Sequence, residues 1–180
     1  MHDINQALMK LQKLGAQELE HVNGDLATQL KGTYGLLKKW GNPEHICLAG
    51  LYHAAYGTDG FADQLVSLEC RKDIAEIIGK EAEALVYFYA ACDRSYFYRQ
   101  IILEDEPSYK DRFTKETFKP SRKLVASFCE LTLANELEIA LKNKAFFDRY
   151  PNITKLFNRF KGLASEPAFN EYKKIFGVDT

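Results

Sequence analysis

Apolar residues recur every three or four positions along most of the chain, which is the spacing that places side chains on one face of a helix. Residues 4–14 show this pattern, and it returns at about 25–40, 43–56, 67–78, 80–99, 121–150, 153–160 and 167–176. No stretch alternates for long between apolar and polar residues, and the weak alternation at 112–118 predicts at most a small hairpin. The pattern therefore predicts one all-α domain, residues 1–180, with about seven or eight helices.

The balance of charge argues against nucleic acid as the main partner. The 180 residues include 24 Lys and Arg against 25 Asp and Glu, so the chain has no basic excess to neutralise phosphates. Its four cysteines form no Cys-x-x-Cys pair and fit reduced core positions. The first residues show no basic-then-apolar leader, and no apolar run reaches the ~20 residues of a membrane span. We therefore expect a cytoplasmic protein whose partners include neither a membrane nor nucleic acid.

Residues 49–61, Ala-Gly-Leu-Tyr-His-Ala-Ala-Tyr-Gly-Thr-Asp-Gly-Phe, form the most distinctive stretch. They begin as an apolar helix and end in a glycine-rich turn. The helical period places His53 on the same face as Ile46, Ala49 and Gly50, so the imidazole is expected among small and apolar residues. Such a histidine is either a core residue satisfied by one hydrogen bond or part of a site, and this stretch alone leaves both interpretations open.

Other polar side chains also fall on the inner faces of predicted helices. Gln29, Asp93 and Asn135 each lie on or beside the apolar stripe of a different helix, so a bundle can bring them close to His53. Such a cluster can hold a metal or a substrate, or it can be a hydrogen-bonded polar knot within the core. A long charged loop is expected at 100–120, and we predict that it covers or borders a cavity shared by His53 and Asp93.

The segment 49–54 (Ala-Gly-Leu-Tyr-His-Ala) resembles the Ala-x-Leu-x-His-Asp helix of the HD superfamily, whose all-α members are mostly metal-dependent phosphohydrolases. On this resemblance, Gln29 stands at the family's first histidine, His53 at the histidine of the His-Asp pair, and Asp93 at the later aspartate. The chain is most similar to an uncharacterised family of small stand-alone HD-like proteins, through residues 40–41, 49–61, 92–94 and 131–137. The resemblance implies a single HD-like helical bundle.

Two of the four HD metal positions depart from the family pattern. Gln29 replaces the first histidine and Ala54 replaces the aspartate of the pair, so only His53 and Asp93 remain. An amide is a poor ligand for a divalent transition metal, and alanine is none. We therefore expect a degenerate metal site with no bound metal and no other cofactor, unless His21 supplies a ligand.

Three functions follow from these features and stay open at the level of sequence. The first is an enzyme acting on a small molecule, with His53 as general acid or base and Asp93 orienting it. Its substrate-binding residues are expected to be His21, Gln29, Tyr56, Arg94 and Asn135. The second is a metal-dependent hydrolase that uses His21, His53 and Asp93. The third is a non-catalytic module that binds or senses a small ligand.

Overall fold

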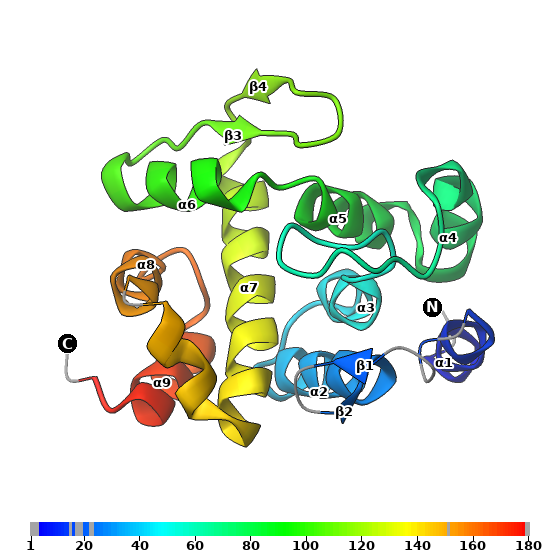
Figure 1. The fold of residues 1–180 in the computed structure, drawn as a ribbon, viewed down its shortest axis with the longest axis horizontal. Coiled ribbons are helices and arrows are strands. Elements are labelled where there is room, and N and C mark those ends of the chain that lie inside the picture. Colours follow the sequence, from blue (N-terminus) through cyan, green and yellow to red (C-terminus); the bar gives the residue numbers. More distant parts are fainter. Residues whose placement is uncertain (1–3, 15, 17–19, 22–23, 151, 179–180) are drawn as a thin grey trace.

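One long helix, α7 (Arg122–Lys142), runs through the middle of the fold (Figure 1). The computed structural model describes residues 4–14, 16, 20–21, 24–150 and 152–178. Ser121 caps α7, because its Oγ accepts a hydrogen bond from the Leu124 amide at 3.3 Å. Every residue from 128 to 140 is buried, although three of them are glutamates. A helix that is buried on all sides needs other elements around its whole circumference.

The elements that pack on α7 cover it from two sides (Figure 1). On one side lie α2 (Leu26–Lys39), α3 (Glu44–Tyr52) and α5 (Lys80–Ala90). On the other side lie the 3₁₀ helix η2 (Lys144–Arg149) and α9 (Glu166–Phe176). This arrangement places α2, α3 and α5, which precede α7 in the chain, opposite η2 and α9, which follow it.

The remaining helices form an outer shell (Figure 1). α4 (Arg71–Ile78) follows the short 3₁₀ helix η1 (Leu68–Cys70) and packs on α5, and α1 (Ile4–Lys13) packs on α4. α6 (Arg94–Leu103) packs on α8 (Ile153–Arg159). Within the described ranges, no helix has the length and apolar character needed to cross a membrane.

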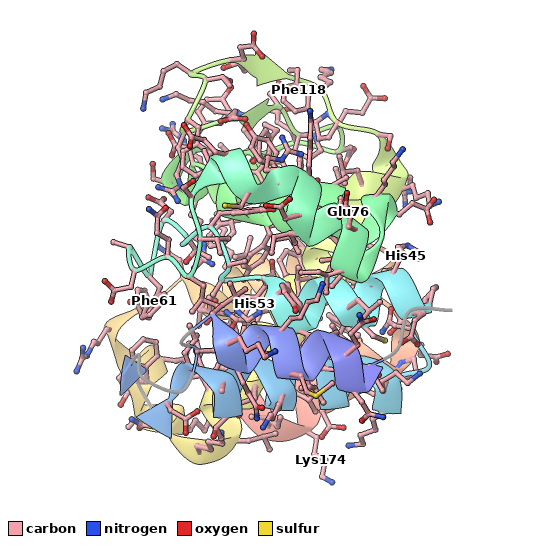
Figure 2. The ribbon with its side chains drawn as sticks, turned by 90° about the vertical axis from the view of Figure 1, so that its right-hand side faces the viewer. His45, His53, Phe61, Glu76, Phe118 and Lys174 are labelled. Carbon is pink, nitrogen blue, oxygen red and sulfur yellow. The ribbon has the colours of Figure 1, made fainter. Side chains whose placement is uncertain are left out.

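The strands of the described residues are two short antiparallel pairs. β1 (Glu20–His21) pairs with β2 (Gly24–Asp25) just before α2. β3 (Tyr109–Lys110) pairs with β4 (Thr117–Phe118) at the top of the molecule in both views (Figures 1 and 2). The predicted all-α fold is therefore confirmed, and a small hairpin does occupy the region of weak alternation.

The long helix predicted over 80–99 is divided in two by the structure. α5 ends at Ala90, and Asp93 begins α6 as its N-cap. Its carboxylate accepts hydrogen bonds from the Tyr96 amide at 3.1 Å and from Ser95 Oγ at 2.8 Å. Aspartate is among the residues most favoured at an N-cap, and this local chemistry outweighs the continuous apolar stripe.

The β3–β4 hairpin holds this helix break in place through backbone carbonyls at the end of α5. The Arg112 amide donates to the Ala91 carbonyl and Arg112 Nε donates to the Ala90 carbonyl, both at 2.7 Å. Tyr109 Oη donates to the Phe88 carbonyl at 2.6 Å. These donors satisfy carbonyls that the end of a helix leaves without intrahelical partners.

An aromatic cluster around Phe128 fixes α5 and α6 against α7. The Phe128 ring lies 5.8 Å from Phe88, 5.4 Å from Tyr89 and 5.1 Å from Phe97, measured between centroids. Edge-to-face and tilted pairs of this kind add to the ~2–3 kcal/mol that burial of each large apolar side chain contributes. The start of α6, and with it Arg94, is therefore rigidly placed relative to α7.

Candidate functional site

The stretch 49–61 folds as a helix end followed by a tight turn. α3 ends at Tyr52, and the Ala55 amide continues the turn by donating to the Tyr52 carbonyl at 2.8 Å. Gly57 has a φ of +68°, and a Cβ there would lie 3.0 Å from the Ala62 carbonyl oxygen, so glycine is strongly favoured. The Thr58 amide then donates to the Phe61 carbonyl at 2.7 Å. The turn closes directly beside His53.

His53 lies inside the fold at the end of α3. Figure 2 shows His45 and His53 at opposite ends of this helix, with Phe61 further toward the edge. The imidazole is 3% exposed, and its Nδ1 lies 2.8 Å from the Gly50 carbonyl oxygen. A carbonyl can only accept, so Nδ1 carries the proton in this contact. The Tyr89 ring packs edge-on at 5.5 Å and fixes the imidazole plane.

His53 forms part of the wall of a cavity of about 920 Å³. This volume is within the range of small-molecule sites. The wall is built from the end of α3, the 58–61 turn, α6, α7 and the 146–155 segment. Its polar or charged residues near His53 include Asp59, Arg94, Asn135 and Glu136.

A chain of polar side chains leads from the cavity into the core. Gln29 Nε2 donates to Asn135 Oδ1 and also lies 3.2 Å from Thr33 Oγ1. Asn135 Nδ2 in turn donates to Glu136 Oε1 at 3.2 Å. Arg94 Nη1 lies 3.8 Å from that same carboxylate oxygen. The chain therefore connects α2, α7 and α6, and its Asn135–Glu136–Arg94 part lines the cavity.

Burial makes the charged groups of this chain sensitive to their neighbours. Burial raises the pKa of the Glu136 carboxyl, against the opposing effects of Arg94 and the Asn135 amide. Burial also raises the pKa of the Tyr98 phenol, which the Arg94 charge opposes. A guanidinium, a carboxyl and a phenol therefore lie together beside His53, and burial rather than pairing has the largest effect on the carboxyl and the phenol.

The structure corrects the expectation that Asp93 orients His53. Asp93 is not among the residues that line the cavity. Its carboxylate caps α6 and forms an ion pair with Lys110 Nζ at 3.1 Å. The Ser95 hydroxyl, Lys110 and the Tyr96 amide lower the pKa of Asp93, against a raising effect of burial. The polar residue that lies against Gln29 is Asn135, on α7, and the group that contacts His53 Nδ1 is the Gly50 carbonyl.

The other predicted site residues divide between the cavity and the core. Arg94 and Asn135 line the cavity, whereas Gln29 lies behind Asn135 with 1% of its surface exposed. Tyr56 is outside the lining, and its hydroxyl donates to Glu83 at 3.0 Å. The backbone of His21 lies in β1, but its side chain is outside the described part of the chain.

The segment 100–120 borders the cavity only at its helical start. Ile102 and Leu103, in the last turn of α6, belong to the wall, and the β3–β4 hairpin does not. The cavity is instead covered by the 146–155 segment, through Phe146, Phe147 and Tyr150 among others. The expected charged cover is therefore replaced by an aromatic one.

The donor set of the described residues does not fit a metal of the HD type. No group of three or more His, Cys, Asp and Glu side chains in that part of the chain is placed to hold a metal ion. The Gln29 amide is engaged with Asn135 and Thr33, and Ala54 offers only a methyl group. The described side chains therefore offer no complete set of metal ligands at this site.

Sequence reasoning missed several residues of the wall. Glu136 and Tyr98 contribute the carboxyl and the phenol, and Phe146 and Phe147 contribute apolar cover. A signal for Glu136 was present, because an acid beside Asn135 within an apolar run of α7 must be buried on a helix without a solvent face. Tyr98 follows Arg94 by four positions, which places both on one face of α6.

The fold and this cavity define an all-α, HD-like helical protein. A solved structure of a metazoan ortholog of SpoT is similar over 98% of this chain and 97% of that chain, with a TM-score of 0.63 and 12% sequence identity. That ortholog is described as hydrolysing ppGpp and as playing a role in starvation responses. The likeness shows that the two proteins share a fold.

At the level of sequence, a family match covers only the first part of the chain. A family model described as a domain of unknown function (DUF6817) matches residues 10–94. The matched region includes His53 and Arg94 and ends before α7, so it covers only part of the cavity wall. No curated protein matches the chain.

Proposed function

We propose that this protein is an enzyme that hydrolyses a small molecule in the cavity, with His53 as its general acid–base group. The observation that carries the proposal is the contact between His53 Nδ1 and the Gly50 carbonyl at 2.8 Å in the cavity wall. This contact assigns the proton of the neutral ring to Nδ1, so Nε2 is the basic nitrogen. Hydrolysis as the reaction class is supported by the shared fold with the ppGpp-hydrolysing ortholog.

In this scheme His53 moves one proton in each half of the reaction. Nε2 takes a proton from a water molecule as the water oxygen bonds to the electrophilic atom of the substrate. The bond to the leaving group then breaks, and the imidazolium returns the proton to that group. The Gly50 carbonyl stabilises the imidazolium through the Nδ1 proton, which is the orienting role that sequence reasoning assigned to Asp93.

The remaining polar residues of the wall position the substrate. Asn135 offers an amide beside His53, and its side chain is held by Gln29 from behind. Arg94 supplies a positive charge at the start of α6. Each of these steps is assigned to a side chain of the described residues and none to a metal. Turnover is therefore expected to persist in the presence of a chelator.

The test is turnover of a panel of phosphomonoesters, carboxylic esters, amides and ppGpp, measured with and without EDTA. His53→Gln is expected to lower kcat by ~100-fold or more, while the control His45→Gln at the other end of α3 leaves it unchanged. Turnover by His53→Gln equal to that of the unmodified protein would overturn the proposal.

Two other outcomes identify the alternatives. Hydrolysis that EDTA abolishes and Zn²⁺ or Mn²⁺ restores would replace this mechanism by a metal-dependent one in which His21, His53 and Asp93 are the ligands to test. Tight binding of a ligand without any turnover would make the protein a non-catalytic binding module.

A further inference from the structure

The guanidinium of Arg94 uses little of its hydrogen-bonding capacity, although the side chain is only 18% exposed. A guanidinium has five N–H donors. Arg94 Nη2 donates to Tyr89 Oη at 3.1 Å, whereas Nη1 lies 3.8 Å from Glu136 Oε1, which is beyond hydrogen-bond distance. Nε is buried and has no partner among the described residues. The guanidinium therefore still has a buried N–H group without an acceptor among the described residues.

Tyr98 adds a second unsatisfied polar group on the same face of α6. Its hydroxyl is buried and, within the described ranges, has no hydrogen-bond partner. Tyr98 lies one turn after Arg94, and both residues line the cavity. Buried polar groups are normally paired, so two adjacent exceptions in a cavity wall indicate a binding position for an oxyanion.

The backbone at the start of α6 does not offer a phosphate site. The Arg94 amide donates to Asp59 Oδ2 at 3.0 Å, and the Tyr96 amide donates to Asp93 Oδ1 at 3.1 Å. Two carboxylates therefore occupy the amides that would otherwise bind a phosphate at a helix N-terminus.

The positive charge that the cavity wall offers near Arg94 is also too small to neutralise a dianion. Glu136 already opposes the Arg94 charge, and the other two cations of the wall, Arg99 and Lys155, are exposed at its rim. A dianion next to Arg94 and Glu136 would leave one more negative charge buried without compensation than a monoanion would. A singly charged carboxylate is the better match.

The wall becomes apolar with distance from Arg94. α6 begins at Arg94 and ends with Ile102 and Leu103, about 12 Å further along its axis. α7 shows the same change, from Glu136 to Ile139. The 146–155 segment supplies aromatic side chains that include Phe146 and Phe147. The cavity therefore suits a molecule with one charged end and an apolar body.

We infer that the substrate of the proposed reaction is an amphiphilic monocarboxylate. Its carboxylate binds the Arg94 guanidinium and Tyr98 hydroxyl, and its apolar body lies between α6, η2 and α8. This inference rests on the proposed function, since it names the substrate class of the same cavity. It assigns Arg94 and Tyr98 to recognition and leaves the proton transfer to His53.

The test is calorimetric binding of a matched series at pH 7.5: acetate, 6-phenylhexanoate, 6-phenylhexanamide and 5-phenylpentyl phosphate. 6-Phenylhexanoate is expected to bind, the neutral amide and the dianionic phosphate about tenfold more weakly or worse, and acetate not measurably. Arg94→Lys should weaken 6-phenylhexanoate by about tenfold or more, because an ammonium lacks the planar fork. Tyr98→Phe should weaken it about fivefold.

The controls are Arg122→Lys at the start of α7 and Tyr96→Phe, neither of which lines the cavity, and both should bind 6-phenylhexanoate normally. A panel in which the phosphate binds most tightly, or in which no phenylalkyl compound binds, would overturn the inference. So would unchanged affinity in a folded Tyr98→Phe together with unchanged affinity in Arg94→Lys.

His53→Gln separates this inference from the proposed function. Retained affinity for 6-phenylhexanoate in His53→Gln, with loss of any hydrolysis that the unmodified protein catalyses, supports both. Arg94-dependent binding without hydrolysis by the unmodified protein supports the carboxylate site and contradicts the catalytic role. His53-dependent hydrolysis of compounds that carry no carboxylate, unaffected by Arg94→Lys, contradicts the carboxylate site and supports the catalytic role.

Discussion

Two Arg–Glu–Tyr clusters in this molecule each surround a buried glutamate, but only one of them is fully paired within the described residues. In the first, Arg71 Nε donates to Glu83 Oε1 at 2.6 Å and Nη2 donates to Oε2 at 3.0 Å, while Tyr56 Oη donates to Oε1. The Arg71 guanidinium also lies 3.8 Å from the centre of the Tyr87 ring. Every strong group in this cluster has a partner.

The second cluster is less completely paired, although Arg94 Nη2 donates to Tyr89 Oη at 3.1 Å and the guanidinium lies 5.2 Å from the centre of the Tyr89 ring. Arg94 and Glu136 approach only to 3.8 Å, and the Tyr98 hydroxyl has no partner in the described part of the chain. Arg71 and Glu83 lie on helices α4 and α5, which pack on each other, whereas Arg94 and Glu136 border a cavity. The comparison indicates that the first cluster stabilises the fold and that the second leaves hydrogen-bonding groups for a ligand.

The largest expected difference is between the two glutamates. Glu83→Gln should lower the free energy of unfolding by about 2 kcal/mol, because it breaks a bidentate pair and disturbs the buried Tyr56 hydroxyl. Glu136→Gln should change it by only ~0.5 kcal/mol, because the lost charge was poorly paired. Urea denaturation of both variants gives the comparison, and equal losses would show that the two clusters do not differ.

The two tyrosines should differ in the same direction by a smaller amount. Tyr56→Phe removes a hydrogen bond to Glu83 and should cost about 1 kcal/mol. Tyr98→Phe removes a hydroxyl that has no partner among the described residues, so its stability should be unchanged or slightly higher. Thermal denaturation measures both. A Tyr98→Phe variant less stable than Tyr56→Phe would mean that the second cluster is already complete without a ligand.

The pH dependence of stability should reveal the raised pKa of the buried Glu136 carboxyl. Its pKa in the folded protein is raised above the ordinary 4.5 by burial, against Arg94 and the Asn135 amide. Tyr89 and Tyr98 also face this group, through Arg94. Between pH 4.5 and the raised pKa, the folded protein holds a proton that the unfolded chain has released, so stability falls as pH rises.

The measurement for this effect is the difference in unfolding free energy between the unmodified protein and Glu136→Gln across that window. The variant should gain relative stability with rising pH, and the gain should level off above the raised pKa. A difference that is constant from pH 4.5 upward would contradict the assignment.

The smallest expected effect is that of a chelator. Metal analysis of protein purified without chelator should find no stoichiometric metal, and EDTA should leave the melting temperature unchanged. Adding ligands should create affinity: Gln29→His, Ala54→Asp and Asn135→Asp together should bind Zn²⁺ or Mn²⁺. The pair Gln29→His and Ala54→Asp, which relies on Asp93, should bind more weakly. Stoichiometric metal in the unmodified protein would instead direct attention to His21.

The fold could be predicted from the sequence because its signals are local. Apolar periodicity identified the helices, and residues such as Ser121 and Gly79 marked their limits. The division between α5 and α6 was missed because the apolar stripe runs on through 91–93. The helix is divided there because the Asp93 carboxylate accepts a hydrogen bond from the Tyr96 amide and caps α6. An N-cap of this kind contributes only about 1 kcal/mol, so the sequence pattern alone does not show that it outweighs a continuous apolar stripe.

The site was predicted in part, for the opposite reason. Three of the seven site residues named from the sequence, His53, Arg94 and Asn135, line the cavity. The prediction placed Asp93 beside His53 because of its position in the order of the HD motif. That order contains no information about where a helix begins or ends. The aromatic cover from 146–155 depends on the packing of η2 on α7 and of α8 on α6, and the α6–α8 contact is a long-range one that no local pattern encodes.

The hairpin on α5 has a consequence for how the protein opens. The Asp93 amide donates to the Lys110 carbonyl at 3.0 Å, and the Arg112 amide donates to the Ala91 carbonyl at 2.7 Å, on either side of the helix break. The start of α6 and the hairpin therefore share hydrogen bonds that must be lost together. In hydrogen exchange, the amides of Asp93 and Arg112 should report a single opening free energy, and each such event releases the helix end that carries Arg94. The hairpin, which contributes no residue to the cavity wall, is thus expected to set how often the start of α6 opens.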